Sequence, residues 1–124
     1  MVKIVNEFNP DLVAITGDFV TFNPKMFVED LVSSLNELTP RDETVAILGN
    51  HDHWTDPDAI RYVMQTSGIR ELSNDVLSLR RGDASLHISG LGDLLEGLDR
   101  LDLVLDRLPG EGAAILLAHE PDKA

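Results

Sequence analysis

Short apolar runs that stop at polar residues alternate with segments of helical spacing in the first half of the chain. Residues 12–15 (LVAI) and 44–48 (TVAIL) have the length and the Val/Ile content of buried strands, and each is followed by a Gly-Asp or Gly-Asn pair. Between them, apolar residues recur at steps of three and four, which predicts an amphipathic helix from Pro24 to the region of Pro40. The inner face of that helix consists of Phe27, Val28, Leu31, Val32, Leu35 and Leu38.

A second helix is predicted directly after the second strand. Asp56 and Pro57 combine an acidic N-cap with proline at the first helical position, which is a common way for a helix to begin. Its inner face would carry Ile60, Val63 and Met64, and a glycine at position 68 would end it. Strand, helix, strand, helix is the order of a parallel sheet with covering helices, so the sequence predicts an α/β fold.

In the second half of the chain, apolar and polar residues alternate strictly. Leucines alternate with serines over residues 77–79, a turn follows at 81–83, and alternation returns over 86–88, which predicts a β-hairpin. His87 lies on the polar face of that hairpin and is expected to face solvent. Residues 98–108 return to helical spacing, and residues 114–117 (AILL) predict a last buried strand.

Composition narrows the possible functions. The chain has 124 residues, which suits a single domain over residues 1–124. Its net charge of −12 argues against general binding to nucleic acid or to anionic lipid. No cysteine is present, which excludes disulfides and thiol catalysis, and no apolar run approaches the length of a membrane span. A cytoplasmic location is favoured.

Three of the predicted strands end in residues that can bind metal or move protons. These are Asp18, the triplet Asn50-His51-Asp52, and His119. In open α/β sheets, ligands gather beyond the carboxyl ends of neighbouring strands, so we expect these side chains to meet there. Carboxylate, amide and imidazole together suit a transition-metal ion, and the glycines before Asp18 and Asn50 would let the backbone turn sharply.

The same stretches resemble the calcineurin-like metallophosphoesterases. The matching segments are residues 10–18 (PDLVAITGD), 48–54 (LGNHDHW) and 116–122 (LLAHEPD), so the resemblance extends over essentially the whole chain. It is strongest to a bacterial branch of phosphohydrolases, although Glu120 stands where that branch has asparagine. The resemblance implies a layered sandwich with parallel central strands, helices and a β-hairpin.

The resemblance also implies a role for each residue. Asp18 would bridge two divalent or trivalent metal ions, such as manganese, iron or zinc, with Asn50 and His119 on the second ion. His51 would act on the leaving oxygen of a phosphomonoester or phosphodiester substrate, and Asp52 would orient its ring. Such a centre would make the protein a hydrolase, either a phosphatase or a phosphodiesterase.

Two motifs of the family are absent from these 124 residues. No Asp-x-His precedes Asp18, and no Gly-His-x-His follows His119. We therefore expect this chain to be the middle of a larger domain, incomplete at both ends and holding at most a partial metal site. The flanking reading frame should encode the two motifs. A sheet shortened in this way would have unpaired edges, which favours self-association.

Several alternatives stay open at this stage. The chain is either the central part of a metal-dependent phosphoesterase or a non-catalytic module, an inactive relative that binds a metal, a phosphate ligand or a protein. His53 and Trp54 are expected at the rim of the pocket or packed on the next helix. Asp93, in Gly-Leu-Gly-Asp, is expected to be a turn residue.

Overall fold

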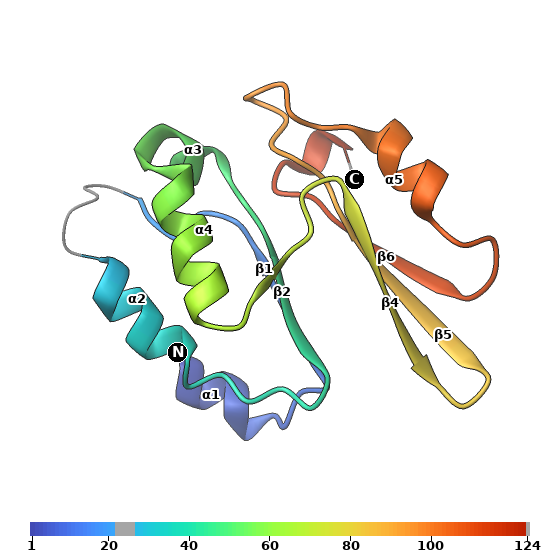
Figure 1. Ribbon diagram of the computed structural model, residues 1–124, viewed down its shortest axis with the longest axis horizontal. Coiled ribbons are helices and arrows are strands. Elements are labelled where there is room, and N and C mark those ends of the chain that lie inside the picture. Colours follow the sequence, from blue (N-terminus) through green and yellow to red (C-terminus); the bar gives the residue numbers. More distant parts are fainter. Residues whose placement is uncertain (22–26, 124) are drawn as a thin grey trace.

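The computed structural model describes residues 1–21 and 27–123. In chain order the elements are α1 (Val2–Glu7), β1 (Leu12–Thr16), α2 (Val28–Leu35), β2 (Glu43–Ile47), α3 (Asn50–Thr55), α4 (Pro57–Thr66), β3 (Arg70–Glu71), β4 (Asp75–Arg81), β5 (Ala84–Gly90), α5 (Leu101–Arg107), β6 (Ala113–Leu117) and the 3-10 turn η1 (Pro121–Lys123). Figure 1 shows α2, α3 and α4 gathered on one side of the strands and α5 on the opposite side.

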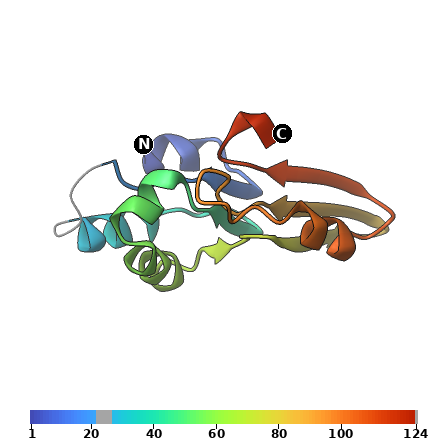
Figure 2. The ribbon, with the colours of Figure 1, turned by 90° about the horizontal axis from the view of Figure 1, so that it is seen from above.

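The strands of the described residues form two sheets. Sheet A has the order β1-β2-β3 with all strands parallel. In sheet B, of order β4-β5-β6, the β4–β5 hairpin is antiparallel and β6 joins β5 in parallel. Figure 2 shows both chain ends on the same side of the molecule. The predicted α/β class, with parallel strands and a hairpin, is confirmed.

Strand β2 lies at the centre of the packing because it buries both of its faces. Successive side chains of a strand point to opposite faces. Ala46 and Leu48 belong to the apolar cluster that includes the buried face of α4. Val45 and Ile47, which alternate with them, belong to the cluster that joins sheet A to sheet B. All four are at most 1% exposed, so the continuous apolar run in the sequence reflects two separate interfaces.

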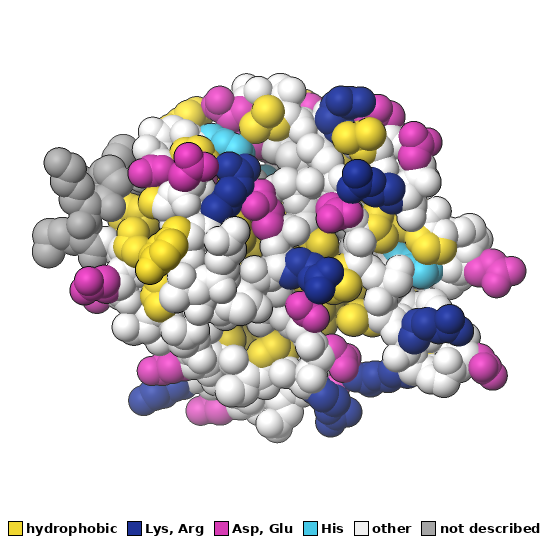
Figure 3. Space-filling view, in the orientation of Figure 1, with side chains coloured by type: hydrophobic (Ala, Val, Ile, Leu, Met, Phe, Trp, Pro, Cys, Tyr) yellow, Lys and Arg dark blue, Asp and Glu magenta, His cyan; other side chains and the backbone are white. Residues whose placement is uncertain are grey.

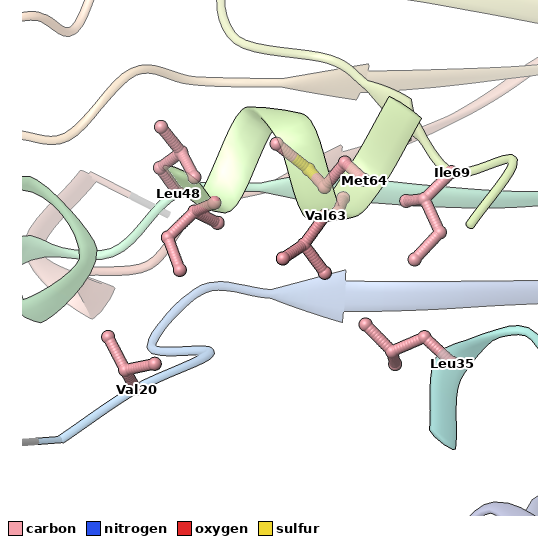
Figure 4. Packing of buried hydrophobic residues seen from close by; sticks show 8 residues of the cluster. Val20, Leu35, Leu48, Val63, Met64 and Ile69 are labelled. Carbon is pink, nitrogen blue, oxygen red and sulfur yellow. The ribbon is translucent and has the colours of Figure 1, made fainter. Parts of the chain in front are cut away.

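Helix α4 forms as its sequence signals predict. The Asp56 carboxylate accepts a hydrogen bond from the backbone N of Ala59 at 3.1 Å, and Pro57 occupies the first turn. The buried residues are Ile60, Val63 and Met64. The chain then leaves the helix through Gly68 at φ +68°, a conformation that glycine adopts without strain. Figure 4 shows the cluster around α4, to which α2 and the segments after β1 and β2 also contribute.

Strand β6 differs from its prediction. The strand is present, but Ile115 is 45% exposed and Leu116 is 38% exposed, so the prediction of a buried strand is wrong. Within the described residues β6 pairs with β5 alone and forms an edge of sheet B. Strand β1 is likewise an edge strand and only half-buried. These apolar edges are compatible with self-association, which stays a prediction.

His87 was expected to face solvent, and this too is wrong. Its side chain is buried, at 4% exposure, and both ring nitrogens have partners. Nδ1 lies 2.7 Å from Ser78 Oγ on the paired strand, and Nε2 lies 2.6 Å from the carbonyl oxygen of Glu111. The loop before β6 covers this part of the hairpin.

The predicted helices differ from the observed ones mainly at their ends. Helix α5 begins at Leu101 and not at residue 98, because the preceding residues form a turn in which Leu98 N donates to the carbonyl oxygen of Asp93 at 2.9 Å. Helix α2 begins at Val28, and Pro24, where the prediction placed its start, lies outside the described residues. Helices α1 and α3 were not predicted.

The visible surface has no large region of one charge. Figure 3 shows acidic and basic side chains interspersed over one face of the molecule. Salt bridges join several of them, for example Arg81 to Asp42 at 2.8 Å and Arg107 to Asp75 at 3.0 Å. Among the described residues, no helix is both long enough and apolar enough to cross a membrane.

We predict that Ile60→Ala lowers the free energy of unfolding by about 2–5 kcal/mol, because it leaves a cavity in the cluster between α4 and sheet A. The matched control is Tyr62→Ala on the same helix, where the side chain is 59% exposed and the change should stay within about 0.5 kcal/mol. Urea unfolding followed by circular dichroism measures both. Equal effects of the two substitutions would contradict the assignment of the buried face.

Candidate metal centre

The turn after β1 presents Asp18 through two successive residues with left-handed backbone. Gly17 has φ +95° and Asp18 has φ +55°. Aspartate tolerates this region better than most residues, but glycine is needed before it. A Cβ on Gly17 would lie 2.6 Å from the backbone N of Gly49 and 2.8 Å from His119 Nδ1. The glycine therefore allows three chain segments to approach one another.

The turn after β2 leads directly into the short helix α3. Gly49 is its N-cap, and Asn50 and His51 are its first two residues. A Cβ on Gly49 would collide with the Asp18 carboxylate and would lie 2.7 Å from His119 Cε1. Because the φ of Gly49 is −104°, its backbone would accept alanine, and glycine is required here only for space.

Asp52 connects these two turns. Its side chain is fully buried, and its carboxylate accepts hydrogen bonds from the backbone N of Gly49 at 2.9 Å and of Val20 at 3.3 Å. Burial raises the pKa of Asp52 above the ordinary aspartate value, and the backbone donors oppose that shift. Asp52 thus holds the residues that follow β1 against the start of α3.

His119 reaches the same place from the other sheet. Its Nδ1 lies 2.7 Å from the carbonyl oxygen of Thr16, the last residue of β1. Its Nε2 lies 3.1 Å from Asn50 Oδ1 and 3.4 Å from Asp18 Oδ1. The structure therefore brings Asp18, Asn50 and His119 together. They do not meet as neighbours in one sheet, as the sequence analysis assumed, because β6 belongs to sheet B.

The hydrogen bond to Thr16 fixes which nitrogen of His119 carries the proton. A carbonyl oxygen can only accept, so the N–H must be at Nδ1, and the neutral ring then has a lone pair at Nε2. That lone pair faces an amide oxygen and a carboxylate oxygen. A lone pair that faces two oxygen atoms favours a positive charge at this place. Histidine ligands to metals commonly donate their other N–H to a backbone carbonyl in this way.

The donor set is small. Within residues 1–21 and 27–123, no group of three or more His, Cys, Asp or Glu side chains is placed to hold a metal ion. The cluster offers one carboxylate and one imidazole, and its third donor is the amide of Asn50. These donor types suit a divalent transition metal, but their number suits a partial site.

His51 lies beside this cluster. Its backbone N donates to Asp18 Oδ1 at 3.2 Å, and its ring Nδ1 lies 3.2 Å from the carbonyl oxygen of Thr21. The ring also faces the indole of Trp54, with 5.1 Å between the ring centroids and an angle of 52°. The Thr21 carbonyl thus helps to orient the imidazole, while the role of Asp52 in orienting it stays a prediction.

Some contributors to the site were not found from the sequence. The carbonyl oxygens of Thr16 and Thr21 orient the two imidazoles, but every residue has a carbonyl group, so residue type gives no signal. Glu96 was not predicted from the sequence either. Its carboxylate accepts a hydrogen bond from the indole N–H of Trp54 at 2.7 Å. Trp54 is 61% exposed and lies beside His51, and its place at the rim of a pocket stays a prediction.

Comparison with known proteins agrees with this geometry. Residues 1–122 match the family model described as calcineurin-like phosphoesterase. The chain is similar to metallophosphoesterase YkuE of Bacillus subtilis, with 32% identity over 100% of the chain and 44% of that protein. It is also similar to metallophosphoesterase Cj0846 of Campylobacter jejuni, with 32% identity over 100% of the chain and 33% of the relative.

A further similarity is to the phosphodiesterase YaeI of Escherichia coli, at 29% identity over 94% of the chain and 43% of that protein. The chain thus spans less than half the length of these relatives. Because the family model extends over nearly all of the sequence, the assignment does not depend on one motif. The chain belongs to the calcineurin-like phosphoesterase family.

Proposed function

We propose that this chain carries the central part of the catalytic centre of a metal-dependent phosphoesterase, which hydrolyses phosphomonoesters or phosphodiesters. The observation that carries the proposal is the convergence of Asp18, Asn50 and His119, with the imidazole of His51 beside them. Family membership supports a phosphoesterase, and the names of the relatives include both a metallophosphoesterase and a phosphodiesterase.

Asp18 Oδ1, Asn50 Oδ1 and His119 Nε2 are the atoms that would hold a metal ion such as Mn²⁺. A bound divalent ion supplies positive charge for the phosphoryl oxygens and makes a neighbouring water more acidic. The chain itself positions these three atoms. A Cβ on Gly17 or Gly49 would collide with neighbouring residues of the site, so glycine at both positions allows the candidate ligands to lie close together.

His51 would donate a proton to the leaving oxygen of the substrate. With Nδ1 directed at the Thr21 carbonyl, a protonated ring has its second N–H, at Nε2, to donate. Proton donation to a leaving oxygen by a positioned imidazole is ordinary general acid catalysis. The contact of the His51 backbone N with Asp18 keeps this ring next to the candidate ligands.

A second candidate function is a non-catalytic module that binds a metal ion or a phosphate ligand. It is favoured by the size of the donor set, because one carboxylate, one amide and one imidazole do not make a closed cage for two ions. Ion stoichiometry and hydrolysis, measured separately, distinguish the two candidates.

We predict that the 124-residue chain binds at most one Mn²⁺ ion, weakly, and that Asp18→Ala abolishes this binding because it removes the only carboxylate of the cluster. Isothermal titration calorimetry gives the stoichiometry. The matched control is Asp58→Ala, which removes a carboxylate that is 93% exposed on α4 and should leave ion binding unchanged. Two tightly bound ions would contradict the partial site.

The same titration tests the role of Gly49. Gly49→Ala should abolish ion binding although its φ suits alanine, because the new methyl group would occupy the space between Asp18 and His119. Gly110→Ala is the control, since a Cβ there meets no atom within 4 Å and should change nothing. Unchanged binding by Gly49→Ala would show that the ion lies elsewhere.

For catalysis we predict that His51→Ala lowers the rate of hydrolysis by roughly 10²–10⁴-fold, the effect of a lost general acid, while the bound metal is retained. The substrates are aryl phosphate mono- and diesters with Mn²⁺ present. The assay compares the 124-residue chain with a version extended by its flanking reading frame where that frame encodes Asp-x-His and Gly-His-x-His. Failure of the extended protein to hydrolyse any of them would favour the binding module.

A further inference from the structure

Trp54 is a large apolar side chain that is exposed and yet held in place. The residue is 61% exposed and lies in helix α3, which begins at the candidate site. The indole N–H donates to Glu96 Oε1 at 2.7 Å, a short bond to a carboxylate. An aromatic side chain fixed in this way offers a flat surface without the entropic cost of ordering it on binding.

The residue that holds Trp54 is itself anchored. The backbone N of Glu96 donates to Asp93 Oδ1 at 2.9 Å, and Asp93 is fully buried. Next in the loop, the backbone N of Leu94 donates to Glu120 Oε2 at 3.2 Å. Glu120 directly follows His119 in the chain. The loop of residues 93–96 therefore connects the indole of Trp54 to Glu120, the neighbour of His119 in the chain.

The indole of Trp54 also lies close to His51, the proposed proton donor. Its ring lies 5.1 Å from that of His51, at an angle of 52°. In the proposed function, His51 acts on the oxygen of the leaving group. A group attached to that oxygen therefore lies next to the His51 ring, where the neighbouring aromatic surface is Trp54.

We propose that Trp54 is a specificity-determining residue, whose indole stacks against a planar leaving group of the phosphoester substrate. The substrate class is an aryl or heterocyclic ester of phosphate, in preference to an alkyl ester. This inference rests on the proposed function. The carboxylate of Glu96 at the indole edge disfavours a leaving group with negative charge of its own, because like charges in proximity repel.

The chain contains one tryptophan, so fluorescence excited selectively at tryptophan, and not at tyrosine, reports on this residue alone. The experiment titrates the 124-residue protein in Mn²⁺ with phenyl phosphate, methyl phosphate and inorganic phosphate. Phenyl phosphate should change the fluorescence at concentrations about three- to tenfold lower than methyl phosphate, which is the contribution expected from one aromatic pair. Asp18→Asn should remove the response to all three probes, since they occupy the site through their phosphate.

Glu96→Ala tests the anchoring directly. It keeps the indole but removes its hydrogen bond, so the preference for phenyl over methyl phosphate should largely disappear while the response to inorganic phosphate remains. Tyr62→Ala is the matched control, because it removes an aromatic ring that is 59% exposed on α4. That variant should retain the full preference.

Equal binding of phenyl and methyl phosphate, or no fluorescence change with any probe, would overturn the inference. Hydrolysis of the two esters by the extended protein, measured in parallel, separates the stacking surface from the proposed function. Tighter binding of phenyl phosphate without hydrolysis supports the stacking surface and counts against the phosphoesterase. Hydrolysis of both esters with equal kcat/KM supports the phosphoesterase and overturns the stacking surface.

Discussion

One hydrogen bond, from Nδ1 of His119 to the carbonyl oxygen of Thr16, determines the chemistry of the candidate site. It spans 2.7 Å between residues 103 positions apart and joins the end of β6 in sheet B to the end of β1 in sheet A. Because the carbonyl fixes the proton on Nδ1, the lone pair at Nε2 faces the oxygens of Asp18 and Asn50. A metal ion bound there would satisfy the lone pair and both oxygens through one positive charge, whereas a second proton on the ring would replace the lone pair with an N–H donor to those oxygens.

Other local features allow the three strand ends to lie close together. Gly17 and Gly49 leave room for neighbouring side chains, and the hydrogen bond from His51 N to the Asp18 carboxylate stabilises the left-handed backbone at Asp18. Buried Asp52 ties the turns after β1 and β2 together through backbone donors. Behind them, β2 buries one face against α4 and the other against sheet B, so the turns that carry the candidate ligands rest on closely packed elements.

The sequence predicted those parts of the fold whose signals are local. Helix α4 was predicted from its N-cap and proline, and the hairpin from its alternation and turn. The exposure of β6 and the burial of His87 were predicted wrongly, because both depend on which distant segment lies alongside. At the site, the residues that meet were predicted from their types at strand ends. The carbonyls that orient the two imidazoles were not, since residue type carries no information about backbone direction.

The state of the His119 ring tests the central claim most directly. Long-range proton–nitrogen NMR spectra resolve the tautomers of all four histidines in the chain. In its neutral form, the His119 ring should carry its proton on Nδ1, and addition of Zn²⁺ as a diamagnetic probe should shift its Nε2 resonance while the other three rings keep theirs. A proton on Nε2, or a Zn²⁺ response confined to the other histidines, would contradict the account.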